Sequence, residues 1–100
     1  MADGGKDLRL ITFKVGPETF VVGILAVRQI IPYEGSTSVP TAPSFIEGVV
    51  IVRNTVVPII DLRSRLYPRV ADSDRRPLVL ITHSRAGTVG LKVDSVRSII

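Results

Sequence analysis

Residues 43–66 read PSFIEGVVIVRNTVVPIIDLRSRL and carry the strongest structural signal in the chain. Two runs rich in β-branched residues, 49–52 and 55–60, flank Arg53 and Asn54. Asparagine tolerates the positive φ that a tight two-residue turn requires. The stretch therefore predicts a β-hairpin with Arg53 at its tip.

The residues around this hairpin predict how it begins and ends. We expect residues 45–48 to form a short helical turn that Gly48 stops. Pro58 cannot donate a hydrogen bond to a ladder, so its strand should lie at an edge or carry a bulge there. Asp61 is expected to cap a short helix over residues 62–67.

Short apolar runs separated by turn residues make up most of the remaining chain. We expect a tight turn at 24–26 followed by a strand, an irregular loop over 32–44 and a charged loop over 68–76. The other predicted strands are 8–15, 19–24, 77–82, 88–93 and 96–100. Many short strands with closely spaced turns predict an all-β barrel fold.

The composition excludes several classes of protein. With 100 residues, 45% hydrophobic and 22% charged, the chain suits one small folded domain and not a disordered segment. It has no cysteine and one histidine, His83, which excludes a disulfide scaffold and argues against a metal centre. Residues 1–7 are expected to be a flexible N-terminus and do not resemble a signal peptide. No uncharged apolar run approaches the roughly 20 residues of a membrane span, so we expect a cytoplasmic protein without direct membrane insertion.

The positive charge is concentrated in the second half of the chain. Residues 1–52 have a net charge of −1, with four Lys or Arg and five Asp or Glu, whereas residues 53–100 have nine and four, a net charge of +5. Nucleic-acid binding would need stacking aromatic residues among these arginines, and the five aromatic residues do not alternate with them. An acidic protein partner is the favoured interpretation, and a basic β-barrel that binds nucleic acid is the alternative.

Residues suited to catalysis are scarce. His83 lies beside Ser84, but the sequence shows neither an acidic residue to orient the histidine nor an oxyanion hole. The glycines do not have a phosphate-binding spacing. We therefore predict no enzymatic activity and no cofactor. Taken alone, Arg53 would be a solvated charge at a hairpin tip and Val27 a core residue.

Three ordered motifs give the chain a recognisable pattern. Residues 43–66 contain a close match to P-x-F-I-x-G-V-x-x-x-R-G-x-x-V-P-I-x-D-L-R, residues 18–31 read ETFVVGILAVRQII, and residues 88–100 read TVGLKVDSVRSII. Together they resemble the CheW family of chemotaxis coupling proteins over about residues 10–100. Two departures are Gln29, where the family usually has Glu, and Asn54, where it usually has Gly.

The resemblance implies two small SH3-like β-barrels packed over a shared apolar seam. Family domains continue beyond the V-D-x-V motif with strands that close the barrels, so we expect residues 1–100 to be a CheW-like domain whose second barrel is incomplete. Missing strands would leave free edges and an exposed seam, from which we expect either self-association of the chain or a loosely ordered C-terminal half.

The resemblance also implies a function and a set of contact residues. CheW proteins are non-enzymatic adaptors that couple chemoreceptor tips to the histidine kinase CheA, whose regulatory domain shares the fold. Carried over by position, the receptor- and kinase-binding residues are Val27, Gln29, Gly48 and Arg53. The expected partners are thus the CheA regulatory domain and the cytoplasmic tip of a methyl-accepting chemoreceptor, with no cofactor and no nucleic acid.

Overall fold

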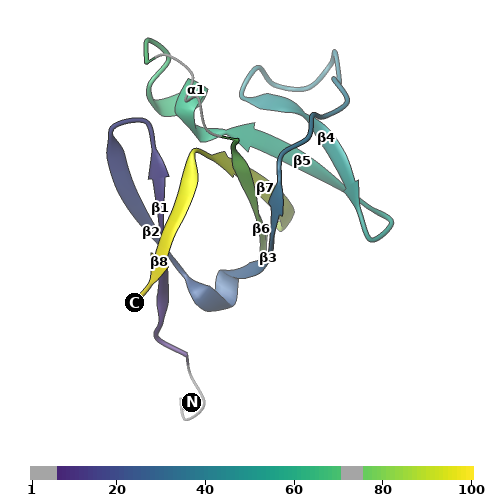
Figure 1. The fold of residues 1–100 in the computed structure, drawn as a ribbon. Helices are drawn as coiled ribbons and strands as arrows, with labels where there is room; N and C mark the ends of the chain where they lie inside the picture. The colour runs from purple at the N-terminus through teal and green to yellow at the C-terminus, as the bar shows by residue number, and fades with distance from the viewer. Residues whose placement is uncertain (1–6, 71–75) are drawn as a thin grey trace.

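The computed structural model describes residues 7–70 and 76–100, which form two β-sheets (Figure 1). The elements in chain order are β1 (Leu10–Val15), β2 (Glu18–Gly23), the 3₁₀ turn η1 (Ile24–Ala26), β3 (Val27–Pro32), β4 (Ile46–Val52), β5 (Thr55–Asp61), α1 (Leu62–Leu66), β6 (Leu78–Ser84), β7 (Gly87–Val93) and β8 (Ser95–Ile99). The predicted all-β class is confirmed.

The strand order brings distant parts of the sequence together. One sheet has the order β2-β1-β8, so the first strand pairs with the last, and Leu10 and Ile100 exchange backbone hydrogen bonds of 2.7 and 2.8 Å. The other sheet has the order β3-β6-β7-β5-β4. The β5–β7 pairing is parallel and the other strand pairs are antiparallel.

The predicted hairpin is present as β4 and β5. Arg53 and Asn54 have φ angles of 50° and 65°, and Val52 lies opposite Thr55. Positive φ at both central residues matches the right-handed twist of the flanking strands. The hairpin therefore holds Arg53 at its tip, as the sequence predicts.

The helical turn predicted over residues 45–48 is wrong, because β4 begins at Ile46. Ile46 pairs with Ile60 and Gly48 with Ile59, while Thr37 and Val49 exchange hydrogen bonds on the other side of β4. These pairings with residues distant in sequence outweigh the local tendency of glycine to end a helix.

The expectation for Pro58 is also wrong, since β5 lies between β4 and β7 and the irregularity in its ladder is in β4, between Ile46 and Gly48. The proline is tolerated because the pairing of β5 with β7 begins only at Ile59. On the β4 side, hydrogen-bonded and non-hydrogen-bonded residue pairs alternate from the hairpin turn onward. Pro58 and Val49 form a non-hydrogen-bonded pair, so the missing N–H of Pro58 costs no hydrogen bond to β4.

The remaining local predictions are largely confirmed. A 3₁₀ turn precedes β3, and Asp61 caps α1 by accepting a hydrogen bond from the Ser64 backbone N–H at 3.2 Å. Of the flexible N-terminus predicted over residues 1–7, residues 1–6 lie outside the described residues, and the Asp7 carboxylate binds Arg9. Residues 71–75 of the predicted charged loop also lie outside them.

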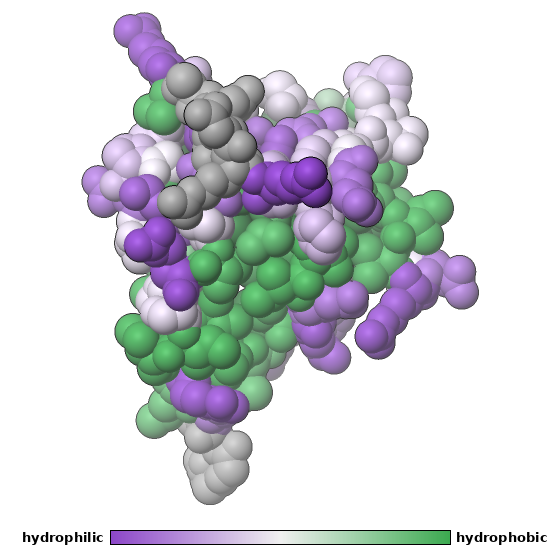
Figure 2. All heavy atoms as spheres, viewed as in Figure 1, coloured by the Kyte–Doolittle hydropathy of each residue, from purple (hydrophilic) through white to green (hydrophobic). Residues whose placement is uncertain are grey.

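The core consists of two clusters that share strand β6. Leu80 packs with Phe13, Val15 and Val93, whereas the neighbours of Leu80 in β6 pack with Val57 and Ile59. A strand that is buried on both faces explains the uninterrupted apolar run of this segment. Figure 2 shows further apolar side chains gathered across the middle of one face of the molecule.

Candidate functional site

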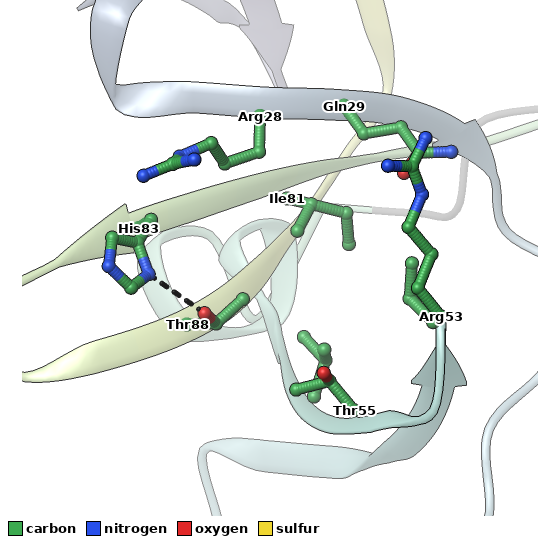
Figure 3. Close-up of a pocket in the computed structure, with 9 residues that line it drawn as sticks. Arg28, Gln29, Arg53, Thr55, Ile81, His83 and Thr88 are labelled. Carbon is green, nitrogen blue, oxygen red and sulfur yellow. Dashed lines mark hydrogen bonds between the residues drawn. The ribbon is translucent and has the colours of Figure 1, made fainter.

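A pocket of about 360 Å³ opens between β3, the β4–β5 hairpin and the β6–β7 hairpin (Figure 3). Its floor contains Val57 and Ile81, both buried in one of the core clusters. The other residues that line it are Arg28, Gln29, Val52, Arg53, Thr55, His83 and Thr88. The pocket thus combines an apolar floor with a polar and basic rim.

Strand alternation explains most of this lining. Thr55 and Val57 are two residues apart in β5, Val52 lies opposite Thr55, and Ile81 and His83 are two residues apart in β6, whereas Arg53 belongs to the hairpin turn. Side chains two residues apart in a strand point to the same face of a sheet. The period of the strands therefore delivers these side chains to one surface.

Arg28 reaches the same pocket because β3 is irregular beside it. Val27 pairs with Thr82 and Gln29 pairs with Ile81, so Arg28 is an extra residue without a partner position in β6. Such a β-bulge interrupts the alternation and re-aims a side chain. As a result, two consecutive residues of β3 line one pocket.

A hydrogen bond joins the two strands at the far end of the pocket. His83 and Thr88 lie directly opposite each other in the β6–β7 ladder, and His83 Nδ1 is 3.0 Å from Thr88 Oγ1. Figure 3 shows this contact at the end toward which the Arg28 side chain runs. The pair holds the imidazole at the rim.

The pocket is electropositive. Arg28 and Arg53 contribute two guanidinium groups, and none of the described residues that line the pocket is acidic. Within residues 7–70 and 76–100, neither guanidinium forms an ion pair or a hydrogen bond. The arrangement suits binding of a negatively charged partner and lacks any evident set of catalytic groups.

A protein-family model described as CheW-like domain matches residues 9–100 of the chain. The chain belongs to this family. The CheW-like chain is 38% identical to the probable chemotaxis protein CheW of Rhizobium etli over 94 residues, which are 94% of this chain and 61% of that protein. It is 36% identical to chemotaxis protein CheW of Rhizobium meliloti over 100 residues, covering 63% of that protein.

A solved structure supports the fold. The scaffolding protein TtCheW from Thermoanaerobacter tengcongensis matches with a TM-score of 0.81 and 25% sequence identity, over 95% of this chain and 65% of that one. The CheW-like chain thus spans between 61% and 65% of the length of these three relatives.

Two of the four predicted contact residues meet in the pocket of the CheW-like domain. Arg53 extends from the hairpin tip toward Gln29 on β3 (Figure 3). Val27 lies on the same strand but does not line the pocket, and Gly48 is buried in β4 beneath Ser36 and Thr37. The structure therefore separates the four residues into a pair at the pocket and two neighbours.

Sequence reasoning did not identify Arg28, His83 and Thr88 as part of this site. His83 and Thr88 lie opposite each other because the turn consists of Arg85 and Ala86 alone, whereas the turn predicted over residues 85–87 would have placed Ser84 opposite Thr88. Arg28 had no local signal, because its orientation depends on the bulge.

A second polar cluster lies at the base of the β4–β5 hairpin, at the end of β5 away from Arg53. Lys92 on β7 binds Glu47 Oε1 at 3.0 Å and Asp61 Oδ2 at 3.5 Å, and its ammonium is 4.3 Å from the centre of the Tyr33 ring. The Tyr33 hydroxyl donates to Glu47 Oε2 and lies 3.0 Å from Ser36 Oγ. This cluster joins three strands to the loop that follows β3.

The electrostatics of the cluster favour the charged form of Lys92. Burial alone would lower the pKa of Lys92, but the hydrogen bond to Glu47 and the negative charges of Asp61 and Glu47 outweigh it, so that pKa is raised. Burial and the hydrogen bond to Glu47 together raise the pKa of Tyr33. The cluster is thus a structural tie between elements.

The described residues offer neither a metal-binding cluster nor a membrane-spanning helix. Residues 7–70 and 76–100 contain no group of three or more His, Cys, Asp or Glu side chains that could hold a metal ion. Within the same ranges, the helices are too short and polar to cross a lipid bilayer.

Proposed function

We propose that this protein is a non-enzymatic adaptor that couples chemoreceptors to the histidine kinase CheA. It binds the cytoplasmic tip of a methyl-accepting receptor and the regulatory domain of the kinase, in the cytoplasm, through protein surfaces alone. The observation that carries the proposal is the meeting of Gln29 and Arg53 in one pocket of a chain that belongs to the CheW-like family.

The physical properties of the pocket support a protein partner. An apolar floor made by Val57 and Ile81 can take an apolar side chain of a helix, and the basic rim can fix the position of that helix. The hairpin holds Arg53 in place before binding, so little backbone entropy is lost when a partner docks. Val27 extends the contact surface along β3, whereas Gly48 acts through the packing of β4.

Co-sedimentation tests this proposal. The chain should pellet with assemblies of the receptor signalling domain, both without and with added CheA. Arg53→Glu should weaken this binding by about tenfold, because it places a negative charge opposite a negatively charged partner. Arg97→Glu is the matched control, since Arg97 is exposed on β8, in the other sheet, and should bind like the unaltered chain.

The two possible failures are distinct. If the unaltered chain pellets with neither receptor nor kinase, the adaptor function is wrong. If the unaltered chain binds and Arg53→Glu binds equally well, the function stands and the role of Arg53 is wrong. The nucleic-acid alternative gains no support from the related proteins, which are chemotaxis proteins by name.

A further inference from the structure

The two guanidinium groups of the pocket point to opposite ends of it. Figure 3 shows the Arg53 side chain extending toward Gln29 and the Arg28 side chain running toward His83, with Ile81 between them. Neither group has an acidic partner among the described residues, and both are exposed. The pocket therefore presents two separated positive charges on either side of an apolar floor.

We infer that this pocket selects a partner segment in which one apolar side chain is flanked by two acidic side chains. The apolar side chain contacts Ile81, one carboxylate binds Arg53 and the other binds Arg28. A helix meets this requirement because residues three or four apart share one face. That the partner is a protein rests on the proposed adaptor function. The inference adds which side chains that protein must present to the pocket.

Gln29 keeps the pocket positive. Its side chain lines the same pocket as Arg53 and carries no charge, so the Arg53 guanidinium keeps its full attraction for a carboxylate of the partner. A glutamate at position 29 would pair with Arg53 and compete with that carboxylate. Gln29 is thus a specificity residue, and the charge at position 29 sets how acidic a partner the pocket accepts.

A phosphate ligand suits this geometry less well. A phosphate group would leave the apolar floor made by Val57 and Ile81 without a partner. A nucleic acid would need aromatic side chains on which bases stack, and no described lining residue is aromatic. We therefore assign the pocket to an acidic protein segment.

Nuclear magnetic resonance titration of the chain with two synthetic helical peptides tests the inference. In the first peptide a leucine is flanked by glutamates one helical turn away on either side, and in the second both glutamates are glutamines. The first peptide should shift the backbone amides of Gln29, Arg53 and Thr88 and bind at least about tenfold more tightly, or about 1.4 kcal/mol. Added salt should weaken only the binding of the first peptide.

Three variants sharpen the test. Gln29→Glu and the double variant Arg28→Gln with Arg53→Gln should each weaken binding of the glutamate peptide by about tenfold or more. Arg97→Gln, the control on β8, should bind like the unaltered chain. Thermal unfolding of each variant establishes that it is folded, because these pocket side chains are at the surface.

The inference is overturned if the two peptides bind equally, if Gln29→Glu binds the glutamate peptide as tightly as the unaltered chain, or if Arg97→Gln weakens binding as much as the pocket variants. It is also overturned if inorganic phosphate, at matched ionic strength, shifts the same backbone amides and binds more tightly than the glutamate peptide. Binding of the glutamate peptide without co-sedimentation with receptor or kinase would support the pocket chemistry and contradict the adaptor function. Co-sedimentation with receptor or kinase without binding of the glutamate peptide would contradict this inference and leave the adaptor function standing.

Discussion

Gly48 shows how a single residue can affect a binding site without touching a partner. It is buried in β4, and a Cβ atom there would lie 2.5 Å from Ser36 Oγ and 2.7 Å from the Thr37 backbone oxygen. Ser36 in turn contacts the hydroxyl of Tyr33. A larger residue at position 48 would therefore displace the loop after β3.

We predict that Gly48→Ala destabilises the domain by about 1–3 kcal/mol, the usual range for overpacking a filled site. The measurement is the urea midpoint, with the melting temperature as a second readout. Gly23→Ala is the control, because Gly23 has φ −62° and a Cβ atom there meets nothing within 4 Å. Equal stability of the two variants would contradict the steric account of Gly48.

Local sequence predicted some residues of the site and could not predict others. Arg53 at a hairpin tip follows from the neighbouring Asn54 and the flanking β-branched runs, which are features of adjacent residues. The bulge at Arg28 and the strand conformation of Gly48 depend on pairing with segments far along the chain. Sequence patterns record the preferences of adjacent residues, but they record only weakly which distant segments pair.

At the scale of elements, the Lys92 cluster ties β4, β5 and β7 together, and Asp61 links it to α1. Burial alone would raise the pKa of Asp61, but the Ser64 N–H and the positive charge of Lys92 outweigh it, and that pKa lies below 3.8. A carboxylate with a lowered pKa stabilises the fold above its unfolded pKa, and this stabilisation is lost as pH falls through the folded value. Asp61 should therefore contribute to acid unfolding below about pH 4.

Asp61→Asn tests this contribution. Asparagine still caps α1 through its side-chain oxygen but does not attract Lys92. We expect a loss of about 1 kcal/mol at pH 7 and a smaller further loss between pH 4 and pH 2.5 than in the unaltered chain, measured by urea unfolding at each pH. Glu34→Gln, at an exposed site, should leave both values unchanged. If the stability of Asp61→Asn fell with pH as steeply as that of the unaltered chain, Asp61 would not be a source of the acid sensitivity.

The hairpins and turns were the elements that sequence predicted best. Each is decided by a few adjacent residues, such as Arg53 and Asn54 or the Asp61 cap. The sheet order was beyond reach, because the parallel β5–β7 pairing and the β1–β8 pairing join segments that share no local signal. Family resemblance supplied the fold where periodicity alone could not.

At the scale of the whole molecule, the three-stranded sheet has two edges. Within the described residues, β2 and β8 each pair only with β1, and both expose apolar side chains, with Val21 55% and Ile99 57% accessible. Unpaired strand edges are templates for pairing with another chain. We propose that these edges mediate self-association.

Sedimentation velocity over a range of concentrations should show a reversible increase in mass. Ile99→Lys should shift the chain toward monomer by about tenfold in dissociation constant, because an exposed lysine on an edge strand opposes pairing. Ala86→Lys adds the same charge in the β6–β7 turn, away from any edge, and should change nothing. A monomer at all concentrations would contradict the proposal.

The contact between the first strand and the last has a consequence for how the chain folds during synthesis. Thr12 and Ser98 meet across 86 positions of sequence, and Leu10 pairs with Ile100. The β1–β2 hairpin is synthesised before β8, the second neighbour of β1, which follows β3 to β7 in the chain. Closing so long a loop is entropically costly, and contacts of this range slow folding. The β1 edge should therefore stay open, and accessible to chaperones, until translation has passed β8.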